Sequence, residues 1–115
     1  MRRAVLSTVV GACVLACGAP VAEAATVRAC KPIKNPYAGT RYEDVDITRI
    51  RATGASCRRA RRVARGAHRK ALGITPPPSG IRRFTWRGWQ VTGNLRGDHD
   101  RYLATRGSRR VRWRF

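Results

Sequence analysis

The strongest constraint on the fold is the segment 56–78, in which small and basic residues separate onto two sides of a helix. Ser56 is a typical N-cap residue, and Gly73 followed by the prolines 76–78 ends the helix. Gly66 weakens this helix by about 1 kcal/mol relative to alanine. The predicted buried stripe consists of Cys57, Ala60, Val63, Ala64, Ala67, Ala71 and Leu72. Because the stripe is mostly alanine, the helix has to lie very close to a surface that supplies larger side chains.

The larger side chains occur in segments with the alternation of strands. One predicted strand, which Gly88 interrupts, contains Phe84, Trp86, Trp89 and Val91. Another is predicted at 44–53, with a bulge near Arg49, because the apolar residues change parity there. A polar loop is predicted at 94–100.

The C-terminal residues predict a β-hairpin, with strands at 102–105 and 110–115 around the turn 106–109. In the last strand one face presents Val111, Trp113 and Phe115. The other face presents Arg110, Arg112 and Arg114. This alternation is typical of a half-buried strand, so Trp113 and Phe115 are predicted to pack with the alanine stripe.

The first 25 residues have the three parts of a secretory signal peptide. A pair of arginines opens the segment, residues 4–16 are apolar or small, and residues 22–24 form a small-x-small cleavage site. We therefore expect a secreted or envelope-located protein that is cleaved after residue 24 or 25. The less favoured alternative is a lipid anchor through Cys17, because residues 14–18 resemble a bacterial lipobox.

Export changes the cysteine count, because Cys13 and Cys17 leave with the signal peptide. Cys30 and Cys57 remain, and a disulfide between them is predicted because such bonds persist outside the cytoplasm. Two free buried thiols are the alternative. The bond would stabilise a domain of about 90 residues by roughly 3–4 kcal/mol.

Together these elements predict an α+β fold, in which one arginine-faced helix packs on a small antiparallel sheet. Residues 26–42 contain Pro32, Pro36 and Gly39, which indicates an extended, irregular arm that the disulfide ties to the helix. The predicted organisation is a signal peptide at 1–25, the arm at 26–42 and a single small domain at 43–115.

The chain carries a formal net charge of +19, and most of its basic residues lie after residue 25. A field of this strength attracts polyanions. Only Lys31, Lys34 and Lys70 are lysines, and the other basic residues are arginines. Two explanations stay open for this abundance of arginine: an anionic partner, or the composition bias of a GC-rich genome.

The basic residues on the outer side of the helix are the best candidate for an anion-binding site. They are Arg58, Arg61, Arg62, Arg65 and Arg69. The arginines of the last strand, Arg110, Arg112 and Arg114, form a second candidate group. Guanidinium groups bind phosphate and carboxylate bidentately. The alternative interpretation is a solvated surface that keeps the domain soluble.

No catalytic constellation is evident, so the sequence predicts a protein that is not an enzyme and needs no cofactor or metal. The triplet Asp98-His99-Asp100 has metal-ligand chemistry, but it is interpreted as a polar loop tip. Acids at 43–46 are interpreted as counter-ions of arginines. His68 is predicted to be solvated on the arginine side of the helix.

Residues 54–65, GASCRRARRVAR, resemble the helix entry of many small exported proteins of actinobacteria, whose pattern is VSCxxARxxxR-like. Residues 88–89 and 107–115 resemble the GWxC strand and the final hairpin of the same family. The resemblance covers residues 45–115 and implies an exported α+β domain, without an assigned function. The family has a second cysteine pair, and Gln90 and Thr105 stand at those positions here.

The sequence thus predicts an exported basic domain that binds anionic envelope components, either an anionic polymer or a membrane surface. Nucleic acid is expected to bind in vitro but not physiologically. The alternative function is a secreted protein-binding or inhibitor module whose partner the sequence does not name. Salt separates the two functions, because polyanion binding weakens steeply with salt and binding through aromatic anchors does not.

Overall fold

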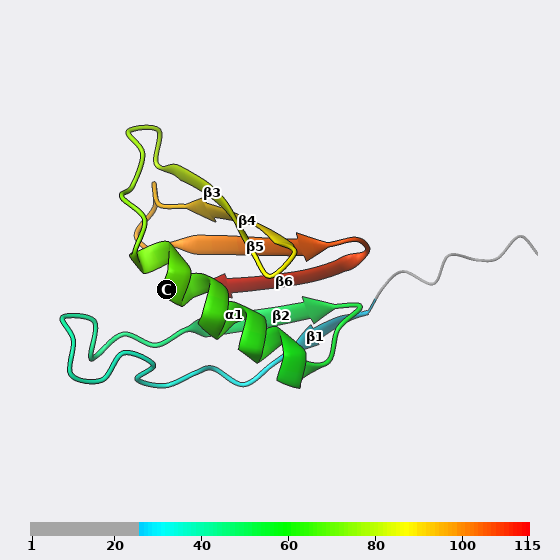
Figure 1. Cartoon of the computed structure of the whole chain (residues 1–115). Helices are drawn as coiled ribbons and strands as arrows, with labels where there is room; N and C mark the ends of the chain where they lie inside the picture. The colour runs from blue at the N-terminus through cyan, green and yellow to red at the C-terminus, as the bar shows by residue number, and fades with distance from the viewer. Residues whose placement is uncertain (1–25) are drawn as a thin grey trace, which may run out of the picture.

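The computed structural model describes residues 26–115, so the predicted signal peptide and the alternative anchor at Cys17 lie outside the described residues. The described chain contains one helix and a six-stranded antiparallel sheet with the order β1-β2-β6-β5-β4-β3 (Figure 1). In chain order the elements are β1 (Val27–Ala29), β2 (Thr48–Thr53), α1 (Cys57–Leu72), β3 (Ile81–Trp86), β4 (Trp89–Asn94), β5 (Arg101–Arg106) and β6 (Arg109–Arg114). This confirms the predicted α+β fold.

The helix α1 has the predicted boundaries and lies across one face of the sheet (Figure 1). The Ser56 hydroxyl oxygen accepts a hydrogen bond from the Arg59 backbone N–H at 3.2 Å, which caps the first turn. The helix packs mainly against β2, β3 and β6. The helix residues that are fully buried are Ala60, Val63, Ala64, Ala67, His68 and Ala71. All but His68 belong to the predicted stripe.

Two glycines make room for aromatic side chains, one between the helix and the sheet and one between neighbouring strands. A Cβ added at Gly66 of α1 would overlap the indole ring of Trp86 on β3. A Cβ at Gly93 of β4 would lie 2.5 Å from Cε1 of Tyr102 on β5. Gly66, which the sequence marks only as a weak point of the helix, is therefore the place where Trp86 packs against it.

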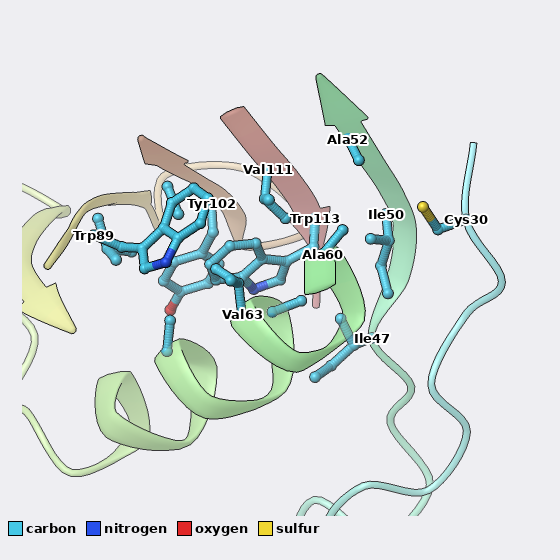
Figure 2. Packing of buried hydrophobic residues seen from close by; sticks show 14 of the residues in the cluster. Cys30, Ile47, Ile50, Ala52, Ala60, Val63, Trp89, Tyr102, Val111 and Trp113 are labelled. Atoms are coloured by element: carbon cyan, nitrogen blue, oxygen red, sulfur yellow. The ribbon is translucent and has the colours of Figure 1, made fainter. Parts of the chain in front are cut away.

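The core lies between the alanine stripe and the large side chains of β4, β5 and β6. The rings of Tyr102 and Trp113 stack with centroids 5.2 Å apart, and Trp89 lies beside them above the helix (Figure 2). Trp113 is 2 % exposed, as predicted from the alternation of the last strand. Phe115 is only half-buried, because it lies beyond the end of β6, where its ring contacts His68.

The segment 84–91 is not one interrupted strand, as the sequence suggests, but parts of two strands. β3 and β4 form a hairpin in which Trp86 lies opposite Trp89. The two turn residues, Arg87 and Gly88, have φ angles of 45° and 81°. Positive φ at both central residues is typical of the two-residue turn that joins antiparallel strands. The glycine therefore reverses the chain.

The N-terminal arm is more regular than predicted. Its residues 27–29 form β1, which pairs with β2 at the edge of the sheet, and Ile33 makes an isolated bridge with Ile47. The Cys30–Cys57 disulfide is present and joins the arm to the first residue of α1. β2 begins at Thr48, later than predicted, and its register shifts between Thr48 and Arg51, which confirms the predicted bulge.

The prediction of a solvated His68 is wrong, because this side chain is fully buried. It lies one helical turn after Ala64 on the buried stripe and faces the arm and the end of β6. Its Nδ1 and the Tyr37 hydroxyl are hydrogen-bonded at 2.6 Å, and its ring lies 4.0 Å from that of Phe115. The arm, which provides Tyr37, thus supplies a polar partner for Nδ1, whereas the buried Nε2 has no hydrogen-bond partner within residues 26–115.

Candidate anion-binding faces

The outer side of α1 gathers the five arginines that the sequence singles out there. These are Arg58, Arg61, Arg62, Arg65 and Arg69, and all of them are exposed. They line one hollow of about 560 Å³ together with Lys34 from the arm and Arg87 from the β3–β4 turn. Trp86 also lines this hollow and has the Arg87 guanidinium 5.0 Å from its ring. We call this surface the helix face.

The strands place a second basic surface on the side of the sheet that faces away from α1. Side chains alternate along a strand, so Val111 and Trp113 point to the helix and Arg110, Arg112 and Arg114 point the other way. The register puts Arg51 of β2 opposite Arg112, and Arg101 of β5 opposite Arg114. We call this surface, formed by the alternate residues of all six strands, the open face.

The open face is also hollowed. A hollow of about 550 Å³ is lined by arginines and by polar or apolar side chains from β2, β4, β5 and β6. Its arginines are Arg49, Arg51, Arg101, Arg112 and Arg114. Its other lining residues are Thr92, Asn94, the half-buried Leu103 and the buried Tyr102 and Trp113. A deep cavity is not needed for a polymer ligand, because a chain can lie along a shallow surface.

Three arginines of this hollow crowd together at one end of the open face. Desolvation, with further contributions from the Arg49 and Arg101 cations, lowers the pKa of Arg114. Arg49 lies at the bulge of β2 with a φ angle of 49°, a conformation uncommon for residues other than glycine. Bulges redirect side chains. A bound anion would relieve the mutual repulsion of the three cations.

The acidic residues of the described chain lie in loops, outside the helix and the strands that form the two faces. Among the elements that the structure describes, no strand and no helix contains an aspartate or glutamate. Glu43, Asp44 and Asp46 precede β2, and Asp98 and Asp100 precede β5. The starts of these two strands lie at the same end of the sheet, since Thr48 and Arg101 both pair with Arg114. The predicted role of the acids as counter-ions of the arginines therefore does not extend along either face.

A buried polar cluster lies under the C-terminal half of α1. Burial, assisted by the Arg82 cation, lowers the pKa of His68 to about 4, so its imidazole is neutral at pH 7. Arg82 is buried on β3 and donates hydrogen bonds to the Tyr102 hydroxyl at 3.2 Å and to the Ile74 carbonyl at 3.0 Å. Burial raises the pKa of Tyr37 to about 12. The rings of Tyr37, Tyr102 and Phe115 lie around His68.

The triplet 98–100 lies in the loop before β5, as predicted. Asp98 and His99 are exposed, and the Asp100 backbone exchanges hydrogen bonds of 2.9 Å with Phe115. Within residues 26–115, no group of three or more histidine, cysteine or acidic side chains is arranged to hold a metal ion. In the same part of the chain, no helix has the length and apolar character that crossing a membrane requires.

Sequence reasoning missed several basic residues of the two faces. Arg49, Arg51 and Arg101 belong to the open face, and the alternation of their strands carries the signal that could have found them. Lys34 and Arg87 join the helix face only through tertiary structure, because they come from the arm and a turn. The helix face and the open face lie on opposite sides of the molecule.

No protein-family model, no curated protein and no solved structure matches this chain. The resemblance to exported actinobacterial proteins therefore stays a prediction. One geometric fact bears on the second cysteine pair of that family. Gln90 and Thr105 lie directly opposite each other on β4 and β5, so side chains at these positions are cross-strand neighbours.

Proposed function

We propose that this protein is an exported, non-enzymatic domain that binds anionic components of the cell envelope. The disulfide suits an oxidising setting outside the cytoplasm. The observation that carries the proposal is the hollow of the helix face, which gathers five arginines of α1 with Lys34 and Arg87. Neighbouring like charges on a helix cost a few tenths of a kcal/mol per pair, and a bound polyanion relieves this cost.

The chemistry of the helix face is that of charge attraction and bidentate hydrogen bonding. Each guanidinium group presents a planar fork of N–H donors that matches a phosphate or carboxylate group. These side chains project from α1 into solvent, where they can adapt to anions of different spacing. The helix face therefore supports attraction to polyanions in general rather than selection of one.

A salt titration tests this function. In the variant Arg58→Gln, Arg61→Gln, Arg62→Gln, Arg65→Gln and Arg69→Gln, the helix is retained because glutamine is also a good helix former. We expect weaker binding to heparin and to phosphatidylglycerol vesicles, and a flatter plot of log affinity against log salt. Equal salt slopes for the variant and the wild type would contradict the proposal.

The same titration addresses the alternative function. A protein-binding or inhibitor module would hold its partner through aromatic anchors, and its affinity would fall little with salt. If the wild type binds neither heparin nor the vesicles at low salt, polyanion binding is rejected. The protein-binding or inhibitor function is then favoured.

A further inference from the structure

The open face has a composition that the proposed function does not by itself explain. Its arginines are Arg49, Arg51, Arg83, Arg101, Arg110, Arg112 and Arg114. Between them lie side chains with hydroxyl or amide groups, namely Thr53, Thr85, Gln90, Thr92, Asn94 and Thr105. None of these residues is buried, so within residues 26–115 no other segment covers them.

We propose that the open face is a binding site for a linear phosphate polymer, which lies along β6 between the arginines of β2 and β5. This inference rests on the proposed function and names the ligand class and the surface that selects it. The chain would be held by Arg112 and its cross-strand partner Arg51, and would pass over Leu103, the partner of Arg112 on β5.

The spacing of the arginines fits a chain with regularly repeated charges. Arg110, Arg112 and Arg114 are alternate residues of one strand, so their Cα atoms are about 6.8 Å apart. Cross-strand partners such as Arg51 and Arg112 are about 5 Å apart. The hydrogen-bonded strands fix the Cα positions of this grid, and its exposed side chains are free to meet a ligand. Phosphates along a chain can therefore meet several guanidinium groups at once.

The polar side chains complete the recognition of phosphate. A phosphodiester has more acceptor oxygens than one guanidinium group can satisfy. Thr92 and Asn94 at the floor of the hollow can donate hydrogen bonds to the remaining oxygens. Leu103, the apolar residue at the centre, leaves room for the chain without offering a competing charge.

Other occupants fit this surface less well. Tyr102 and Trp113 border the hollow, but they are 3 % and 2 % exposed and stack on each other on the covered side, so neither ring offers a face on which a base or sugar ring could stack. Leu103 and Ile81 are only half-exposed, and the exposed Val27 lies on the edge strand, so apolar anchors for a bilayer are lacking. A second copy of the chain would bring arginines against arginines. Charge complementarity therefore favours a phosphate chain without rings.

The test compares two variants of equal net charge. The open-face variant is Arg51→Thr, Arg101→Thr and Arg112→Thr, in which threonine suits a strand. The helix-face variant is Arg58→Gln, Arg62→Gln and Arg65→Gln. Both lose three positive charges, so a difference between them reports position rather than total charge. Thermal unfolding of each variant checks that the fold is retained before binding is measured.

The probe is long-chain inorganic polyphosphate, with single-stranded DNA and phosphatidylglycerol vesicles as competitors at equal phosphate concentration. We expect the open-face variant to lose about tenfold or more in polyphosphate affinity and about two units of salt slope, since each lost contact removes roughly 0.7. The helix-face variant should lose a few-fold about equally for all three ligands. A third variant, Arg51→Lys, Arg101→Lys and Arg112→Lys, keeps the charge but loses the bidentate fork, so its polyphosphate affinity should fall between those of the wild type and the open-face variant.

Each outcome decides between the two proposals. Equal losses in the two variants would overturn the open-face site while leaving polyanion binding intact. Tighter binding of wild type to DNA or to vesicles than to polyphosphate would also overturn it, in favour of that ligand. Failure of the wild type to bind any of the three would remove the proposed function together with this inference.

Discussion

The two faces of the sheet are built from the same strands and yet have opposite properties. On β6, Trp113 is 2 % exposed in the core, whereas its neighbour Arg112 lies exposed on the open face. The covered face derives its stability from aromatic rings packed against alanine and glycine of α1. The open face contributes little apolar burial. Along each strand, alternate residues thus serve stability on the covered face and charge on the open face. Substitutions on one face can therefore change one property without the other.

The largest effect is expected for Trp113→Ala on the covered face. The substitution removes a buried indole that stacks on Tyr102, and it should destabilise the fold by about 3–5 kcal/mol. This loss is a large fraction of the total stability of a small domain, about 5–15 kcal/mol. Urea denaturation followed by circular dichroism measures the loss. The matched control is Arg112→Thr, which should change stability by less than about 0.5 kcal/mol. Similar losses in both variants would break the comparison between the faces.

The next effect concerns the bond that keeps the arm at the covered side. Replacing Cys30 and Cys57 by serine opens a link across a sequence separation of 27 and should cost roughly 3–4 kcal/mol. Denaturation of the oxidised wild type and the double variant measures the difference. Non-reducing mass analysis of exported protein shows whether the bond forms. Two free thiols in a fully stable protein would show that the arm is held by its β-sheet pairing alone.

A third prediction concerns pH. The pKa of His68 is about 4 in the folded protein and about 6.5 when unfolded, so between these values the unfolded state binds the additional proton. Stability is therefore complete above pH 6.5 and falls as the pH drops towards 4, by roughly 3 kcal/mol. His68→Gln should remove this part of the pH dependence. The exposed His99 gives the control, because His99→Gln should leave this pH dependence of stability unchanged.

The smallest effect is expected where the helix meets β3. Gly66→Ala places a methyl group where the Trp86 indole now lies. The substitution should reduce the stability of the fold by about 1–3 kcal/mol, although alanine is the better helix former. In a Trp86→Ala background the space is free, and the same change should stabilise the protein by up to about 1 kcal/mol. A double-mutant cycle by thermal unfolding measures this reversal of sign. Equal effects in both backgrounds would contradict the close contact.

Much of the fold follows from local patterns. The cap at Ser56, the alanine stripe and the alternation in β6 each bury a recognisable set of residues, so the helix and the final hairpin are predictable. β1 is not, because its residues are all exposed and its pairing with β2 depends on contacts distant in sequence. His68 has the spacing of the buried stripe, but its partner Tyr37 comes from the arm. A polar residue on an apolar stripe is misread when its partner is remote.

The candidate site was predictable in part for a similar reason. The arginines of α1 and β6 follow helical and strand spacing, and both groups lie on exposed faces. Arg49 and Arg101 join Arg114 only because the sheet places β2 and β5 on either side of β6. Strand order is a property of the whole chain, and no local pattern specifies it. The sequence therefore predicts the arginines that β6 contributes to the open face, but not the arginines that the neighbouring strands add.

The placement of all five described acids in the two loops before β2 and β5 gives the molecule an electric dipole that runs along the strands. Near a negatively charged surface, such a dipole experiences a torque. The molecule turns until the acidic loops point outward and the opposite end, where β2 leads into α1, points inward. The sheet then stands upright on the surface. In this orientation Arg87 and the N-terminal end of the helix face meet the surface, while the open face stays accessible to polymer chains.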